Sequence, residues 1–399
     1  MKPAWHYRPE SNWINDPNGL VHWNGWYHMF YQYNPHGDQW GDIHWGHARS
    51  SDLLHWETLP IALTPAAEKG ELHCFSGGCC KDERGIPHFF YTSIGAAEAG
   101  RDCVHGAQQW YAEPVDEDLS LLMQTDEQAL TDAIHGGMHV RDWRDPCVLR
   151  YGGQYLMVLG GCVEERGCVL LYTSPDMRQW TYRHILAQAE KKDGIPWECP
   201  NLVQVDGKLV LIYSPCAEVR AKIGTLDEEL RFHEEGEEIV DPSARSGFYA
   251  PQVFTDEAER VILIGWMPEC DNVPHKGWSG VMSLPRILHI TADGLCAQPV
   301  PGAREMAGVQ QLQVLCEELP KTWRIHDNGA EYTALTLSAD GTLTLDRSQS
   351  SLAESPDKHA ITRSVPVLDV NNIFIAVDAS AVEVAVNGKW LSGRIYPTK

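Results

Sequence analysis

Short apolar runs separated by turn-forming pairs recur along the first three quarters of the chain. In each repeat a polar motif opens one strand, a turn follows, and a strongly apolar strand returns, as in residues 27–31, 155–159 and 209–213. The intervening turns carry Asn-Gly, Gly-Gly or Asp-Gly, which accept the positive φ that tight hairpins require. The pattern therefore predicts a succession of antiparallel β-hairpins.

A second landmark, an aspartate with Leu or Met one to three residues later, closes each unit. These aspartates are Asp52, Asp118, Asp176, Asp227 and Asp293. They recur about every 50 to 70 residues, a period that suits one four-stranded propeller blade. Five units predict an all-β fold with a five-bladed β-propeller over residues 1–297.

The pattern changes after Ala297. Pro299 to Gly302 reads as part of a linker over residues 298–308. Beyond it, apolar and polar residues alternate with a period of two, which predicts a small β-sandwich over residues 309–399. The sandwich is interpreted as a sugar-binding module, a structural cap or an oligomer surface.

Propeller geometry brings distant polar motifs together. If each motif opens the innermost strand of its blade, the side chains at these strand entries project at one end of the central channel. These residues are Asp16, Ser76, Asp145, Glu198 and Tyr249. A single Asp before Pro is commonly a turn cap, but caps have no reason to recur at one place in a repeat. The set therefore indicates a functional site.

Composition narrows the class of partner. The net charge of −23 disfavours nucleic acids and anionic membranes, so a neutral small molecule is expected. The 15 Trp residues suit carbohydrate, because flat aromatic faces pack on sugar rings. No signal peptide or uninterrupted apolar span is evident, and the 12 Cys are scattered, which predicts a cytoplasmic protein without a disulfide framework. No metal or other cofactor is expected; His44 and His47 are interpreted as packing or hydrogen-bonding residues.

Four ordered motifs resemble those of glycoside hydrolase family 32, which includes invertases, levanases, inulinases and sucrose-6-phosphate hydrolases. They are residues 13–19, 75–77, 144–146 and 197–200. The resemblance implies a five-bladed propeller followed by a β-sandwich, in agreement with the repeat. It also implies that Asp16 is the nucleophile of a retaining mechanism, Glu198 the general acid/base and Asp145 the transition-state stabiliser.

The resemblance further implies a set of substrate-binding residues. They are Asn15, Gln32, Trp40, Phe75, Ser76, Arg144, Cys199, Tyr249 and Trp266. A place in the core fits Trp266 nearly as well. Burial and neighbouring negative charge are expected to keep Glu198 protonated near neutral pH. Arg144 is expected to keep Asp145 charged.

The activity implied is that of a β-fructofuranosidase, which releases β-D-fructose from the non-reducing end of sucrose or short fructo-oligosaccharides through a covalent fructosyl-enzyme. A fructosyltransferase with the same residues, a related pentosan hydrolase and a non-catalytic fructan-binding protein are the alternatives. Net acidity favours free sucrose, whereas sucrose 6-phosphate would need a cation near the channel mouth. Arg101, Arg245 and Lys276 are the candidates for it.

The C-terminal region departs from the family. Its members usually continue for two or more strands beyond the motif at residues 393–397, whereas this sequence stops at Lys399. We therefore expect a truncated and less stable sandwich, or a homo-oligomer that covers its exposed edge.

Overall fold

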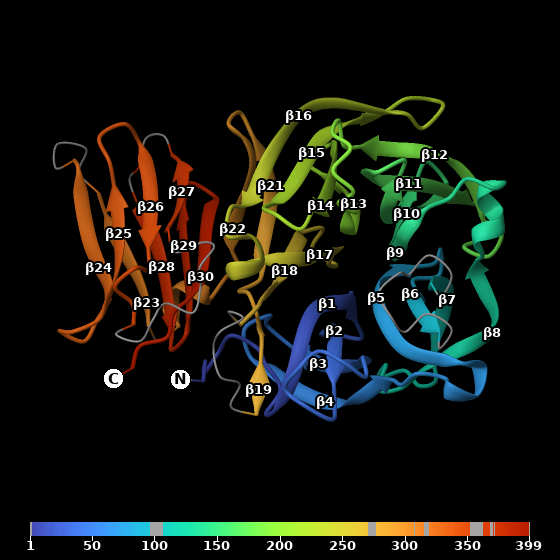
Figure 1. The fold of residues 1–399 in the computed structure, drawn as a ribbon, viewed down its shortest axis with the longest axis horizontal. Helices are drawn as coiled ribbons and strands as arrows, with labels where there is room; N and C mark the ends of the chain where they lie inside the picture. The colour runs from blue at the N-terminus through green and yellow to red at the C-terminus, as the bar shows by residue number, and fades with distance from the viewer. Residues whose placement is uncertain are drawn as a thin grey trace.

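The computed structural model describes residues 2–95, 107–269, 277–306, 308–314, 319–351, 362–367, 370 and 372–398. Five sheets of four main antiparallel strands surround a channel, and two further four-stranded sheets lie beside them (Figure 1). The predicted all-β fold, a five-bladed propeller followed by a sandwich, is confirmed.

The blades follow one another along the chain. Blade one contains β1 (Asn12–Trp23), β2 (Trp26–Asn34), β3 (His44–Ser50) and β4 (Trp56–Leu63). Blade two contains β5 (Glu71–Lys81), β6 (Pro87–Gly95), β7 (Ala107–Pro114) and β8 (Leu122–Leu130). Blade three contains β9 (Arg141–Tyr151), β10 (Gln154–Val163), β11 (Arg166–Ser174) and β12 (Thr181–Gln188). Blade four contains β13 (Glu198–Val205), β14 (Lys208–Ser214), β15 (Val219–Leu226) and β16 (Phe232–Asp241).

Blade five is less regular. It contains β17 (Tyr249–Thr255), β18 (Val261–Met267), β21 (Arg286–Thr291) and β22 (Gly294–Pro299), with the short β20 (Val281–Met282) paired to β18. Short 3-10 helices lie in the connections: η1 (Ala67–Lys69), η3 (Asp132–His135), η4 (Ala244–Ser246) and η5 (Ala303–Glu305).

The first strand of every blade is the innermost one. Strands β1, β5, β9, β13 and β17 each contact the next, and β17 returns to β1, so they form a closed ring (Figure 1). The short strand β19 (Trp278–Ser279), which follows β18 in the chain, pairs in parallel with the start of β1. Blade one is thereby completed by a strand from the end of the propeller.

The hydrophobic pattern explains this arrangement. The second strands are buried on both faces because blades pack face to face, and β10 is buried at nine of its ten positions. Phe30 of blade one, for example, meets Phe89 of blade two edge to face at 5.1 Å. The predicted hairpin turns are present, since Asn24 and Gly25 have φ values of 50° and 79°.

The sandwich has two sheets. One contains β23 (Val309–Gln313), β28 (Asn372–Asp378), β29 (Ala381–Val386) and β30 (Lys389–Arg394). The other contains β24 (Lys321–Asp327), β25 (Tyr332–Leu337), β26 (Thr342–Asp346) and β27 (Thr362–Pro366). Leu335, Leu343, Ile373 and Val384 pack between the sheets without solvent exposure. Because β22 ends at Pro299, it extends two residues into the predicted linker; the domain boundaries remain predictions.

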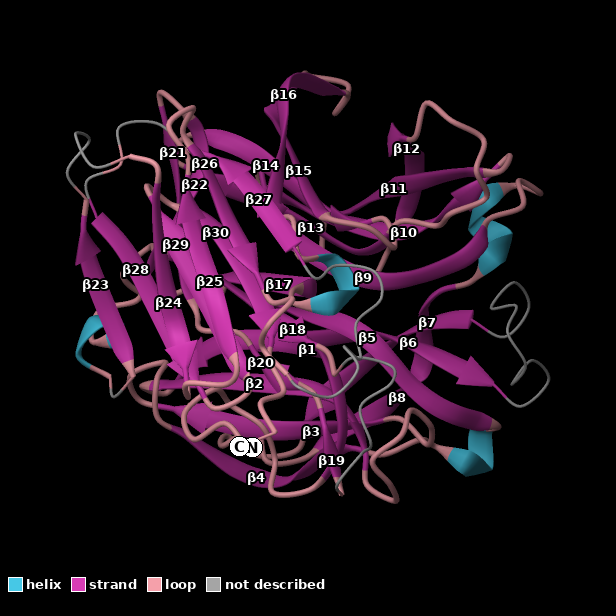
Figure 2. Cartoon of the chain, turned by 60° about the vertical axis from the view of Figure 1, so that its left-hand side comes forward, coloured by secondary structure: helices cyan, strands magenta, loops and turns pink. Residues whose placement is uncertain are grey.

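The sandwich packs closely on the propeller. Its edge strand β30 contacts β16, β18 and β22. At this interface the buried guanidinium of Arg286 donates to Glu383 at 2.6 Å and to Asp241 at 3.1 Å, while it lies between the rings of Phe248 and Trp390. The two chain termini lie side by side at the junction (Figures 1 and 2). The predicted oligomer contact at the sandwich edge remains a prediction.

Within the described ranges, no helix is both long and apolar enough to span a membrane.

Candidate active site

A β-bulge interrupts every inner strand at its polar motif. Pairing with the second strand shifts between Ile14 and Pro17, Cys74 and Gly77, Arg144 and Cys147, Glu198 and Asn201, and Tyr249 and Gln252. In three of these bulges a non-glycine residue with left-handed φ stands directly before a proline: Asp145 at 65°, Cys199 at 47° and Ala250 at 45°. Bulges redirect side chains and tolerate proline, which has no N–H to offer a ladder. The motif side chains are therefore turned into the channel.

These side chains meet in one cavity of about 420 Å³ at the end of the channel where the inner strands begin. The cavity is lined by Trp13, Asn15, Asp16, Gln32, Trp40, Phe75, Ser76, Arg144, Asp145, Glu198, Cys199, Arg245, Tyr249, Trp266, Pro268 and Glu269. All twelve site residues expected from the sequence are among them. The structure thus brings together side chains that are separated by up to 251 residues, from Asn15 to Trp266.

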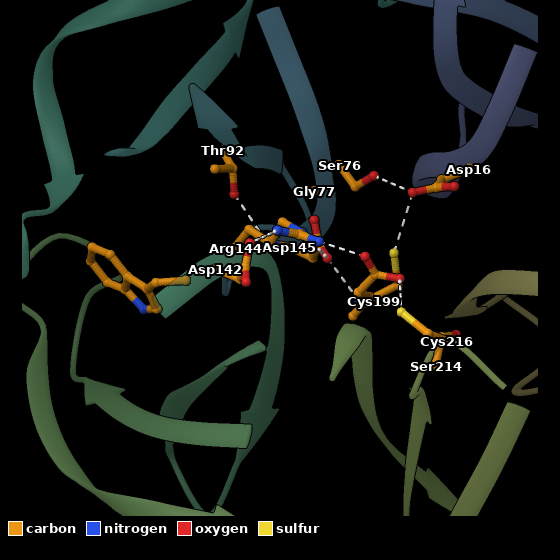
Figure 3. Close-up of polar contacts among 12 residues, drawn as sticks. Asp16, Ser76, Gly77, Thr92, Asp142, Arg144, Asp145, Cys199, Ser214 and Cys216 are labelled. Atoms are coloured by element: carbon orange, nitrogen blue, oxygen red, sulfur yellow. Dashed lines mark hydrogen bonds and ion pairs between the residues drawn. The ribbon is translucent and has the colours of Figure 1, made fainter. Parts of the chain in front are cut away.

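Asp16 is oriented by three hydrogen bonds. Its Oδ2 accepts from the hydroxyl of Ser76 at 2.6 Å and from the thiol of Cys199 at 3.3 Å (Figure 3). Its Oδ1 accepts from the amide of Asn15 at 3.1 Å. Burial raises the pKa of Asp16, while the bonds from Ser76 and Asn15 favour the ionised form. The Oδ2 atom of Asp16 is thereby held in place by groups from blades two and four.

Asp145 is almost fully buried between blades three and four. Its Oδ2 accepts the backbone N–H of Cys199 at 2.8 Å, and its own N–H donates to the hydroxyl of Thr92 at 3.0 Å. Burial raises the pKa of Asp145 to about 7, although Arg144 and the Cys199 N–H act in the opposite direction. Asp145 thus retains a proton to a much higher pH than an ordinary carboxyl group.

Glu198 has the opposite electrostatic environment. Arg144 Nη2 donates to its Oε1 at 2.5 Å, Arg245 Nη2 donates to its Oε2 at 3.0 Å, and the hydroxyl of Tyr249 also donates to Oε2. Burial opposes ionisation, but Arg144, Arg245 and Tyr249 outweigh it and lower the pKa of Glu198 to about 2.

One expectation about charge is therefore wrong. Glu198 does not hold a proton near neutral pH, because its nearest charged neighbours are positive. Arg144 favours the charged form of Asp145, as expected, with its Nε 3.7 Å from Asp145 Oδ2, but its Nη2 is also hydrogen-bonded to Glu198.

Aromatic rings form the walls of the cavity. Trp40, which is 52% exposed, stands at the rim and meets Phe75 edge to face at 6.1 Å. Trp266 pairs with Tyr249 across β17 and β18 and meets the ring of Trp13 at 5.7 Å. Trp266 therefore lines the cavity, which favours the site interpretation over a place in the core.

Sequence reasoning missed Glu269 and Pro268, which follow β18. Glu269 Oε1 lies 2.5 Å from Arg394 Nη2, and its Oε2 accepts from the hydroxyl of Tyr396 at 2.8 Å. Both partners belong to the C-terminal motif at residues 393–397, which was the only sequence signal for this contact.

Arg245 is the one phosphate-site candidate that the structure places, and it lines the cavity; Arg101 and Lys276 lie outside the described residues. His44 Nδ1 lies 2.6 Å from the carbonyl oxygen of Asp42, and His47 Nε2 lies 3.0 Å from His28 Nδ1. Over the described part of the chain, no group of three or more His, Cys, Asp or Glu side chains is arranged to hold a metal ion.

Comparison with known proteins gives a consistent result. A family model described as the glycosyl hydrolases family 32 N-terminal domain matches residues 6–299. A sucrose-6-phosphate hydrolase of Escherichia coli is 32% identical, over 99% of this chain and 89% of the relative; a raffinose invertase of Escherichia coli is 31% identical over the same shares.

Solved structures agree. The sucrose-6-phosphate hydrolase of Lactobacillus gasseri superposes with a TM-score of 0.85 at 25% identity, covering 99% of this chain and 88% of that one. The fructan 1-exohydrolase IIa of Cichorium intybus superposes with a TM-score of 0.83 at 24% identity, covering 100% and 92%. The family match, the propeller fold and the bulged motifs together establish that the chain belongs to glycosyl hydrolase family 32.

Proposed function

We propose that this family 32 member is a retaining β-fructofuranosidase that releases β-D-fructose from the non-reducing end of sucrose or short fructo-oligosaccharides. The observation that carries the proposal is the convergence of Asp16, Asp145 and Glu198 in one cavity, from the inner strands of blades one, three and four. Relatives named as sucrose-6-phosphate hydrolase and raffinose invertase support this reaction class.

In the first step the carboxylate of Asp16 attacks C2 of the fructosyl unit. The C2–O bond to the leaving group breaks, and Glu198 supplies a proton to the departing oxygen. A covalent fructosyl ester on Asp16 results. The bonds from Ser76 and Asn15 fix the attacking carboxylate in position, which lowers the entropic part of the barrier.

In the second step water resolves the ester. Glu198 accepts a proton from the water as its oxygen bonds to C2, and Asp16 leaves as a carboxylate. Asp145 is assigned to fructose hydroxyls: its buried carboxyl group gains strength as a hydrogen-bond partner where water is excluded. Trp40 and Trp266 supply apolar walls for the sugar rings.

A product profile tests the proposal. Purified protein is incubated with sucrose, sucrose 6-phosphate, inulin and levan, and the products are separated by chromatography. Free fructose should appear from sucrose and from the chain ends of short oligomers. Release of no fructose from any of the four contradicts the proposal, and oligosaccharides as the main products at high sucrose would identify a transferase instead.

We also infer a cytoplasmic location. Nine cysteines within the described ranges are free thiols, among them the exposed Cys216, and free thiols persist best in a reducing compartment. Fractionation of cells that express the protein tests this inference.

The homo-oligomer predicted through the sandwich is tested by light scattering after size-exclusion chromatography, where a stable monomer would contradict it.

A further inference from the structure

The carboxylate of Glu198 is saturated with hydrogen-bond donors. Arg144 occupies Oε1, while Arg245, Tyr249 and the thiol of Cys216 share Oε2. A general acid must carry a proton on one of these oxygens and direct it at the leaving group. At least one donor therefore has to leave Glu198 when the substrate enters.

Arg144 and Tyr249 are held in place by other contacts. The Arg144 side chain is 14% exposed, and its Nη1 donates to Asp142 at 2.9 Å. The Tyr249 hydroxyl accepts the N–H of Cys216 at 2.9 Å and lies 3.2 Å from the carbonyl oxygen of Ser214. Moving either group would leave buried polar atoms without partners, which is unfavourable.

Arg245 is different. Its side chain is 56% exposed, at the mouth of the cavity, and Glu198 is its one ion-pair partner within the described residues. The guanidinium lies over the ring of Tyr249 at 4.9 Å, a contact that it can keep while it turns outward. Water and substrate groups can therefore replace Glu198 as its partner.

The backbone that carries Arg245 is fixed by the sandwich. The N–H of Ser392 donates to Ser243 Oγ at 2.9 Å, and Arg363 Nη2 lies 3.4 Å from the hydroxyl of Ser246. A side chain at Gly247 would collide with the carbonyl oxygen of Ser392, so the turn and β30 are in close contact. Movement is thus confined to the Arg245 side chain.

We propose that Arg245 is a specificity-determining residue that leaves Glu198 and binds a negatively charged substituent, such as a phosphoryl group, on the leaving group of the substrate. The proposal rests on the proposed fructosidase function, which places the leaving group beside Glu198. Once Arg245 has left, Glu198 takes a proton from solvent and can deliver it to the departing oxygen. The negative charge of the whole protein favours neutral substrates, but Arg245 places an exposed cation at this mouth.

Other groups face Glu198 as well. They are Arg144 from β9, Tyr249 from β17, Cys216 from the β14–β15 connection, and Asp16, Asp145 and Cys199. These groups face Glu198 whether the leaving group is charged or neutral. A pH effect on activity that differs between the two leaving groups is therefore assigned to Arg245.

The test compares Arg245→Gln with wild type on sucrose 6-phosphate and sucrose. Wild type should have the higher kcat/KM on the phosphorylated sugar, and the ratio of the two kcat/KM values should fall at least tenfold in Arg245→Gln. Arg245→Lys, which keeps the charge, should retain an intermediate ratio. The matched control is Arg150→Gln, whose guanidinium is 52% exposed, pairs with Glu83 and lines the cavity at the opposite end of the channel; its ratio should stay within twofold of wild type.

A pH profile separates this role from a structural one. Because Glu198 loses a cation in Arg245→Gln, the alkaline limb of kcat/KM on sucrose should move to higher pH. If the wild type is active but Arg245→Gln changes neither the ratio of the two kcat/KM values nor the alkaline limb, the inference is overturned. The proposed function then remains intact. A wild-type protein that releases fructose from neither sugar overturns both.

Discussion

Arg394, on the last strand of the sandwich, forms an ion pair with Glu269, which lines the cavity in the propeller; Nη2 and Oε1 are 2.5 Å apart. The Arg394 side chain has no solvent exposure, and its Nη1 also donates to the carbonyl oxygen of Met267 at 3.1 Å. The second domain therefore supports one wall of the site directly.

Replacement of Arg394 by Gln should weaken the contact between the two domains and the cavity wall that it supports. The change leaves the Glu269 carboxylate buried without its cation, so the free energy of unfolding should fall by about 3 to 5 kcal/mol. KM for sucrose should rise, because the wall loses its support. Urea unfolding and steady-state kinetics measure the two effects. Arg324→Gln, which removes an exposed arginine from the same domain, is the control and should change neither; equal behaviour of the two variants would contradict the assignment.

Glu198→Gln should lower kcat on sucrose by roughly 10² to 10⁴-fold, because the Gln amide cannot transfer a proton to the leaving group. With fructosyl fluoride, whose leaving group needs no proton, the variant should release a burst of fluoride equal to the enzyme concentration and then stall. The burst should be absent in Asp16→Asn, which lacks the nucleophile. The exposed surface variant Glu235→Gln should match wild type. A burst in Asp16→Asn would show that another group attacks C2.

Asp145→Asn should stabilise the fold at alkaline pH while it impairs activity. Burial raises the pKa of Asp145 to about 7 in the folded state, so between its unfolded value and pH 7 the folded protein binds the extra proton. Stability from this group is therefore full at acidic pH and is lost as pH rises through 7. The stability gain of the variant should be larger at pH 8 than at pH 5 by roughly 2 to 4 kcal/mol. Chemical unfolding at the two pH values measures it, and an equal gain at both would refute the buried-charge explanation.

The buried pair of His28 and His47 in blade one should make the protein sensitive to acid. Burial and Arg49 lower the pKa of His28 to about 4. Between pH 6.5 and 4 the unfolded chain therefore binds a proton at this residue that the folded protein does not bind. Stability should fall as pH drops from 6.5 toward 4, by roughly 3 kcal/mol from this group. His28→Gln should show a shallower decline in unfolding free energy between pH 7.5 and 5. A decline as steep as that of wild type would place the acid sensitivity elsewhere.

The fold could be predicted because each blade repeats the same polar entry, hairpin turn and apolar return. The bulges could not be read from polarity, since Asp145, Cys199 and Ala250 differ in character. What they share is the following proline, which cannot donate to a ladder and is therefore tolerated at a bulge. This proline was the available signal for the redirected side chains.

The composition of the site was predictable from its motifs, but the pairing of its charges was not. Arg144 and Asp145 are neighbours in sequence and form an ion pair at 3.7 Å, yet Arg144 also reaches Glu198 on the next blade. Arg245 reaches the same carboxylate from a turn outside the repeat. Such partners depend on how blades are placed in space, which no local pattern records.

The parallel pairing of β19 with β1 has a consequence for synthesis of the protein. Strand β1, which carries Asp16, obtains its second neighbour only when Trp278 and Ser279 have left the ribosome. A nascent or prematurely terminated chain that ends before Trp278 already contains Asp16, Asp145 and Glu198 but leaves the edge of β1 unpaired. Hydrolytic competence therefore arrives late in translation, and fragments that carry all three acids are not expected to act on sugar before β19 has paired with β1.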